Sequence, residues 1–78
     1  MVTNLDPGTY RIRVLGKVSK KMPYLKGLSI TFEEHKDYGT LTVISGEFTD
    51  QEALFELLYA LSKSNISVLS LERLKTDK

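Results

Sequence analysis

One segment of the chain has every signal of a complete amphipathic helix, and it limits what the other residues can form. The segment runs from Gly46 to Ile66 and reads GEFTDQEALFELLYALSKSNI. Four leucines recur in it at helical spacing and form one apolar stripe: Leu54, Leu57, Leu58 and Leu61. Burial of each leucine stabilises a fold by roughly 1.5 to 3 kcal/mol, so the stripe must pack against another element. In a chain of 78 residues, this predicts one small domain whose helix covers a sheet.

The ends of this helix also carry recognisable signals. Thr49 stands three residues before Glu52, which is the spacing of a capping box, where hydroxyl and carboxylate each accept a hydrogen bond from a backbone N–H. Asp50 adds negative charge near the positive end of the helix dipole, and Lys63 suits the negative end. Asn65 is a residue type that adopts the left-handed conformation after a helix. We therefore expect Thr49 as the N-cap and Asn65 at the C-terminal end.

Four segments show the alternation of half-buried β-strands. They are Tyr10–Leu15, Leu28–Glu33, Thr40–Ser45 and Ile66–Leu74. In the first three, alternation predicts that these side chains share the core with the leucine stripe: Tyr10, Ile12, Val14, Leu28, Ile30, Phe32, Leu41 and Val43. Ile44 then falls on the polar face, with Thr40 and Thr42. The last segment is apolar on both faces, which indicates either a β-bulge or partial cover of each face.

The order of the elements predicts an α+β domain, a two-layer sandwich with a four-stranded antiparallel sheet. The connection Lys17–Gly27 decides the topology, and we expect one or two helical turns there rather than an irregular loop at the sheet edge. The fold is then ferredoxin-like, a split βαβ arrangement with a short first helix. The alternative is a β-meander followed by the helix and a last strand. The domain is expected to span residues 9–74, with a short tail at 1–8 and a frayed C-terminus at 75–78.

The composition excludes several kinds of functional site. The chain has no cysteine and a single histidine, His35, so it can form neither a disulfide nor a thiolate site nor a His-rich metal site. It has no Gly-rich phosphate loop and no nucleophile motif, and the adjacent Glu33 and Glu34 point to opposite faces of their strand. We therefore expect no enzyme activity and no cofactor. No segment resembles a signal peptide or reaches membrane-spanning length, so we expect a soluble cytoplasmic protein without membrane contact.

Positive charge is concentrated in the first part of the chain. No acidic residue lies between Pro7 and Phe32, although the net charge of the whole chain is only +1. Six basic residues lie there: Arg11, Arg13, Lys17, Lys20, Lys21 and Lys26. This set is a candidate contact for an anion or a nucleic acid. Nucleic acid is not the partner we expect, because Arg11 and Arg13 can pair with Glu33 or Glu72 across strands, and the polar sheet face offers no aromatic ring for base stacking.

A further pattern lies at cap, core and turn positions of GLSITFEE and TVISGEFTDQEALFELLYALSKSNISVLSLERL. Its most specific residues are Gly27-Leu28, Gly46, Asp50-Gln51, Ala53-Leu54, Leu57-Leu58 and Val68-Leu69-Ser70. From Tyr10 to Leu74 this pattern resembles a group of short, uncharacterised bacterial and archaeal proteins whose helix reads Asp-Gln-Ala-Ala-Leu-His-Gly-Leu-Leu. This chain has Phe55 and Glu56 where that group has His and Gly. The resemblance implies a stand-alone small domain and no histidine chemistry on the helix.

Two aromatic residues of the helix lie outside its leucine stripe. Phe55 and Tyr59 are four positions apart, so they are neighbours on one flank. They either close the edge of the core or form an exposed patch for a partner. We expect a patch that is partly exposed, which a two-fold dimer would cover. The sequence therefore predicts a non-catalytic protein-interaction module that forms a homodimer or binds another protein.

Overall fold

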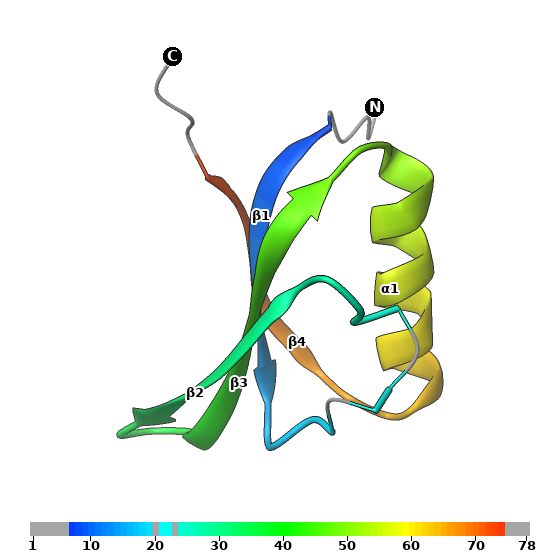
Figure 1. The fold of residues 1–78 in the computed structure, drawn as a ribbon. Helices are drawn as coiled ribbons and strands as arrows, with labels where there is room; N and C mark the ends of the chain where they lie inside the picture. Colours follow the sequence, from blue (N-terminus) through cyan, green and yellow to red (C-terminus); the bar gives the residue numbers. More distant parts are fainter. Residues whose placement is uncertain (1–6, 20, 23, 75–78) are drawn as a thin grey trace, which may run out of the picture.

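The computed structural model describes residues 7–19, 21–22 and 24–74 of the chain. The elements follow one another as β1 (Gly8–Leu15), β2 (Ser29–His35), β3 (Gly39–Phe48), α1 (Gln51–Lys63) and β4 (Val68–Leu74). The strands form one antiparallel sheet in the order β2-β3-β1-β4, and α1 packs on one face of it (Figure 1). The predicted small α+β domain with a four-stranded antiparallel sheet is thus confirmed. The tail predicted for 1–8 and the frayed end at 75–78 lie almost entirely outside the described residues.

The pairing of β1 decides the topology. β1 pairs with β3 and β4, so it is not a neighbour of β2, and the alternative β-meander is wrong. The connection between β1 and β2 passes along the side of the sheet that carries α1 (Figure 1). None of its described residues is helical, so the helical turns predicted for Lys17–Gly27 are not formed there. The physical reason is the backbone conformation of Tyr24 and Gly27, whose φ angles of 75° and 84° interrupt a right-handed helix.

The faces of β3 are the reverse of the prediction. Ile44 lies opposite Ile12 of β1 and Ile30 of β2, and directly opposed residues of an antiparallel pair share a face. Ile12 and Ile44 belong to the core under α1, so Leu41 and Val43 point to the other face. Both are nevertheless buried, because β3 is a central strand with cover on its two faces. A strand that is apolar on both faces gives no clear alternation.

Thr42 lies on the helix side of β3 and is fully buried, although it was predicted to face solvent. Its hydroxyl accepts a hydrogen bond from the backbone N–H of Val18 (3.0 Å) and donates one to the carbonyl oxygen of Gly16 (2.6 Å). Both groups belong to the β1–β2 connection, which also contributes Val18 and Leu25 to the core. A polar residue can face the core here because the connection satisfies it.

Replacement Thr42→Val should lower the free energy of unfolding by about 1 to 3 kcal/mol, because it leaves two backbone groups of the connection without their partner. Thr42→Ser retains the hydroxyl and serves as the matched control, with a smaller loss expected. Urea denaturation of the two variants measures the difference. Equal losses would mean that position 42 supplies a methyl group to the core rather than two hydrogen bonds.

Phe32 is more exposed than predicted. It lies opposite Thr42 and therefore on the helix side, yet its exposed fraction is 47%. The β2–β3 hairpin extends away from α1, so the helix does not cover this end of the sheet (Figure 1). Lys17 Nζ lies 5.5 Å from the centroid of the Phe32 ring, which is within the range of a cation–π interaction.

The mixed faces of the last strand arise from a β-bulge. β4 pairs with β1, and its register shifts between Arg13 and Val14. Beyond the shift, Ser70 and Glu72 lie opposite Arg13 and Arg11 on the face away from α1. The bulge explains why strict alternation failed for this segment.

The leucine stripe of α1 packs on the sheet as predicted. Leu54, Leu57 and Leu61 are buried, and Leu58 packs against the same core from the flank. At the C-terminal end, the backbone N–H of Ile66 donates to the Leu61 carbonyl (2.9 Å), and that of Asn65 donates to the Ser62 carbonyl (3.0 Å). These two bonds form a Schellman motif, and the φ of 60° at Asn65 confirms its predicted left-handed conformation.

The N-terminal cap differs from the prediction by one residue. The N-cap is Asp50, whose side chain accepts a hydrogen bond from the backbone N–H of Ala53 at 2.9 Å. With Asp50 as the cap, the third helical position is Ala53 rather than Glu52, so the capping box predicted for Thr49 does not form. Two capping residues stand side by side in the sequence, and asparagine, aspartate and serine are preferred over threonine at this position.

Asp50→Ala should therefore cost about 1 kcal/mol of stability, whereas Thr49→Ala should change it little. The first variant leaves the N–H of Ala53 without its acceptor, and the second removes no bond of the cap. Thermal or urea unfolding of both variants compares them directly. A larger loss for Thr49→Ala would place the N-cap at residue 49.

Candidate interaction surfaces

The outer side of α1 presents an aromatic pair to solvent. With Leu57 toward the sheet, Phe55 lies about 160° and Tyr59 about 200° round the helix at 100° per residue. The exposed fractions are 41% for Phe55 and 66% for Tyr59. Lys63 Nζ lies 5.7 Å from the centroid of the Tyr59 ring. The prediction that both residues are partly exposed is thus confirmed, and self-association through them stays a prediction.

The sheet face away from α1 carries a network of ion pairs. Arg11 Nη2 lies 2.8 Å from Glu72 Oε1, and Arg13 Nη1 lies 3.4 Å from the same oxygen. Arg13 Nε also lies 3.1 Å from Glu33 Oε1. Because β3 separates β1 from β2, the Arg13–Glu33 pair must span β3. The two side chains thereby cover Val43 of β3, which is buried. The predicted pairing of the two arginines with Glu33 or Glu72 is confirmed, since Arg11 pairs with Glu72 and Arg13 pairs with both.

These ion pairs shift the pKa values of Glu72 and Arg13. The hydrogen bond from Arg11 is the main cause that lowers the pKa of Glu72 below its ordinary value of 4.5, with the charges of Arg11 and Arg13 acting in the same direction. The hydrogen bond to Glu33 is the main cause that raises the pKa of Arg13. All four side chains are exposed enough for solvent to screen the pairs, so each contributes modestly to stability.

The lowered pKa of Glu72 makes the stability of the fold depend on pH, and it fixes the sign of that dependence. A carboxyl group whose pKa is lower in the folded state stabilises the fold above its unfolded pKa, and this contribution is lost as the pH falls through the folded pKa. We expect the urea midpoint of the native chain to fall below pH 4.5 more than that of Glu72→Gln. Glu52→Gln, a change on the exposed side of α1, is the control. Parallel pH profiles for native chain and Glu72→Gln would contradict the shift.

Five of the six basic residues of the first part of the chain are described, and they are spread over different surfaces. Arg11 and Arg13 are engaged with glutamates on the face away from α1, whereas Lys17 lies over Phe32 on the helix side. Lys21 and Lys26 are exposed in the β1–β2 connection. Lys20 lies outside the described residues. The described members therefore do not line one continuous groove for a phosphate backbone.

His35 has a structural role in the hairpin turn. Its Nδ1 accepts a hydrogen bond from the backbone N–H of Asp37 at 3.0 Å, and its ring lies 4.9 Å from that of Tyr38. Within residues 7–19, 21–22 and 24–74, no group of three or more His, Asp or Glu side chains could hold a metal ion. No helix in this part of the chain is long and apolar enough to cross a membrane.

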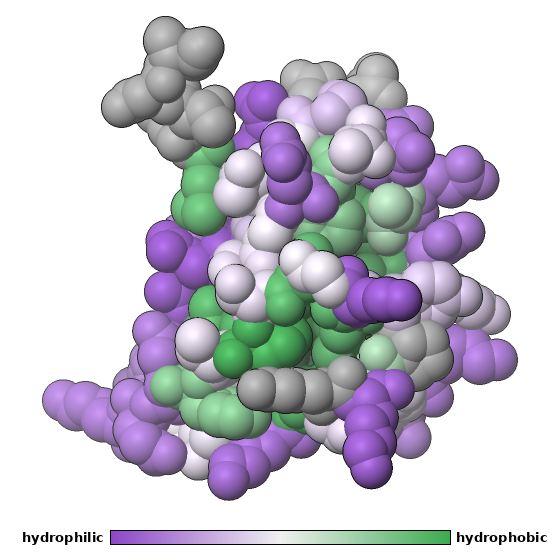
Figure 2. Space-filling model, in the orientation of Figure 1, coloured by the Kyte–Doolittle hydropathy of each residue, from purple (hydrophilic) through white to green (hydrophobic). Residues whose placement is uncertain are grey.

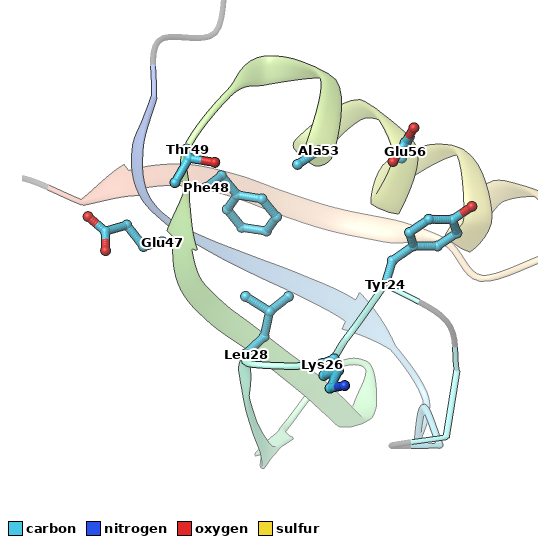
Figure 3. A pocket seen from close by; sticks show the side chains of 8 residues that line it. All are labelled: Tyr24, Lys26, Leu28, Glu47, Phe48, Thr49, Ala53 and Glu56. Carbon is cyan, nitrogen blue, oxygen red and sulfur yellow. The ribbon is translucent and has the colours of Figure 1, made fainter.

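A cavity of about 180 Å³ lies between the β1–β2 connection, the end of β3 and the first turns of α1 (Figure 3). Its floor is apolar and consists of Leu28, Phe48 and Ala53. The Phe48 ring packs edge-to-face on Tyr10 at a centroid distance of 6.1 Å, so the floor is continuous with the core. Figure 2 shows apolar surface between the sheet and the helix on the face turned toward the viewer.

The rim of the cavity is polar and aromatic. It consists of Tyr24, Lys26, Glu47, Thr49 and Glu56. In Figure 3 the Tyr24 ring stands at one end, near α1, while Thr49 stands at the opposite end and the Glu47 side chain points away from the apolar floor. The two ends come from segments that are far apart in the sequence and meet only because the connection passes beside α1.

A close contact between a glycine and a leucine shapes the cavity floor. A Cβ atom at Gly46 would lie 2.5 Å from Leu28 Cδ2, so glycine at this position lets the Leu28 side chain pack directly on β3. Gly46 and Leu28 are two of the residues on which the resemblance to the short prokaryotic proteins was based. Sequence reasoning found these residues as core and turn positions but did not bring Tyr24, Lys26 and Glu56 together, because no local pattern relates them.

Comparison with known proteins gives one match. Residues 9–72 match the model of a family described as Domain of unknown function (DUF8691). No curated protein and no solved structure matches the chain.

Proposed function

The chain belongs to this family of domains of unknown function, since the match covers most of its residues, and we propose that it is a non-catalytic protein-interaction module that self-associates. The observation that carries the proposal is the exposure of Phe55 and Tyr59 on the outer side of α1, at 41% and 66%. An adjacent pair of exposed aromatic rings is a large apolar patch for a domain of 78 residues. Aromatic residues are enriched where protein interfaces are fully buried.

The apolar surface continues from α1 toward one edge of the sheet. Glu56 faces the β1–β2 connection across the cavity, so the opposite flank of α1, with Leu58, faces the β4 side, and Phe55 lies between this flank and the outer side. At that edge, Val68 and Leu71 of β4 are 41% and 37% exposed. Among the strands of the described residues, β4 pairs with β1 alone, which leaves backbone groups of its other side available.

A second copy of this chain is the occupant we favour. In a two-fold interface each subunit presents the same patch, so one apolar surface covers the other without a different partner. The exposed edge of β4 could extend the interface by strand pairing.

The test is sedimentation equilibrium of the full chain over a wide range of concentration. We expect a dimer at high concentration and a weaker dimer for the double variant Phe55→Ser, Tyr59→Ser, with an unchanged circular dichroism spectrum. Tyr38→Ser is the matched control, because the exposed fraction of Tyr38, 53%, lies between those of Phe55 and Tyr59, but Tyr38 lies in the β2–β3 turn, away from α1. The control should dimerise like the native chain.

Two results would refute self-association through α1. The first is a native chain that remains monomeric at high concentration, because the proposed dimer then does not form. A double variant that dimerises as strongly as the native chain places the interface elsewhere.

We also propose that the fold is ferredoxin-like with its first helix replaced by an irregular connection. The support is the strand order, in which β3 is inserted between β1 and β2 and β4 pairs with the other side of β1. That is the arrangement of a split βαβ unit. A connection of thirteen residues, 16–28, is long enough to cross from β1 to a parallel β2 without a helix.

A further inference from the structure

The β1–β2 connection is fixed to the core at two places, and the first is held by hydrogen bonds. The backbone N–H of Gly16 donates to the carbonyl oxygen of Thr40 at 2.9 Å. The Thr42 hydroxyl bonds both the N–H of Val18 and the carbonyl oxygen of Gly16. The Val18 side chain is also buried, with 5% of it exposed. Release of this first place therefore breaks three hydrogen bonds to β3 and one apolar contact.

The second place is the segment Tyr24–Gly27, and only its Leu25 is buried. Leu25 is 3% exposed and belongs to the core, whereas the other residues of the segment are exposed. In the described part of the chain, the only hydrogen bond of this segment joins the Leu25 carbonyl oxygen to the N–H of Leu28 at 3.0 Å. That bond stays within the connection, so one apolar side chain alone holds the segment to the core.

The backbone at the two ends of this segment favours its release. Tyr24 has a φ of 75°, in the left-handed region that residues with a Cβ atom rarely adopt. This conformation does not bury the ring, because 54% of Tyr24 is exposed. Gly27 has a φ of 84°, and a Cβ atom placed there would have no described neighbour within 4 Å. The glycine can therefore change its backbone angles without a clash, whereas the tyrosine is strained while Leu25 is buried.

From this contrast we propose that Tyr24–Gly27 is a latch, which takes Leu25 out of the core while Val18, the sheet and α1 stay folded. Segments with few buried contacts and few hydrogen bonds open below the free energy of global unfolding. Tyr24 and Lys26 border the cavity beside α1, so opening of the latch removes one wall and exposes more of its apolar floor (Figure 3). The latch is a conformational device that goes beyond the proposed interaction function and does not rest on it.

The test uses introduced thiols, because the native chain has no cysteine. Leu25→Cys reports on the latch, Val18→Cys on the first place of attachment, and Leu57→Cys on the fully buried face of α1. The rate of modification by a soluble thiol reagent gives the opening constant of each site under native conditions. Urea denaturation of the same variant gives its constant for global unfolding.

We expect the ratio of these two constants to differ among the sites. The opening constant of Leu25→Cys should exceed its global unfolding constant by at least about 100-fold, with a weak dependence on urea. The ratio should be at least about ten-fold smaller for Val18→Cys and close to one for Leu57→Cys. Loss of the leucine does not bias the ratio, because its contact is absent from both the open and the unfolded state.

The native chain offers a second measurement that needs no substitution. The N–H of Leu28 is bonded to the Leu25 carbonyl, and that of Val18 is bonded to Thr42. In hydrogen exchange the opening constant should therefore be at least about ten-fold larger at Leu28 than at Val18. This measurement decides the question even where Leu25→Cys does not fold.

Two substitutions of Tyr24 isolate the backbone strain. Tyr24→Asn and Tyr24→Ala both remove the ring, but asparagine adopts the left-handed conformation more readily than alanine does. In the Leu25→Cys background, modification should be about three- to ten-fold slower with Tyr24→Asn than with Tyr24→Ala. The alanine variant is thus the matched control for loss of the ring.

Three results would overturn the proposal. Equal ratios for Leu25→Cys and Val18→Cys would mean that the connection has no separate latch. Modification of Leu25→Cys at the rate and urea dependence of global unfolding would mean that the segment does not open by itself. Equal rates with Tyr24→Asn and Tyr24→Ala would show that strain at residue 24 does not favour opening.

Discussion

The pairing of β1 with β3 is the interaction on which the rest of the structure depends. Since β3 occupies the place beside β1, β2 lies one strand further out, and the chain must cross the helix side of the sheet to reach it. That crossing brings Val18 and Leu25 into the core and supplies the two backbone groups that satisfy Thr42. It also brings the connection beside α1, where the two enclose the cavity. One strand pairing thus determines the composition of the core, the face of β3 that is buried and the position of the cavity.

The elements with strong local signals were predicted well. The leucine stripe, the left-handed Asn65 and the alternation of Tyr10, Ile12 and Val14 depend on residues close in sequence, and each was found as expected. The N-cap was wrong by one residue, because Thr49 and Asp50 are both capable caps and only the geometry selects between them. These results show that periodicity and end signals identify an element better than its exact limits.

The errors arose where a distant segment decides the environment of a residue. Ile44 was assigned to the wrong face because Leu41 and Val43 are buried on the other side, partly beneath the Arg13–Glu33 pair that spans β3. The exposure of Phe55 and Tyr59 could be predicted from one helix alone. The cavity could not, because its lining comes from the connection, the end of β3 and α1. A site made by the crossing of two segments leaves no pattern in either of them.

The central position of β1 also has a consequence for how the chain folds during synthesis. β1 is made first, yet its neighbours come late, since Gly8 pairs with Phe48 and Thr9 pairs with Leu74. The β2–β3 hairpin and α1 can form from local contacts, while β1 must wait for partners at large sequence separation. Until β4 has left the ribosome, Tyr10, Ile12 and Val14 belong to an incomplete sheet that can bind other apolar segments. The sheet is therefore complete only after β4, the strand of the domain that is made last, has been added.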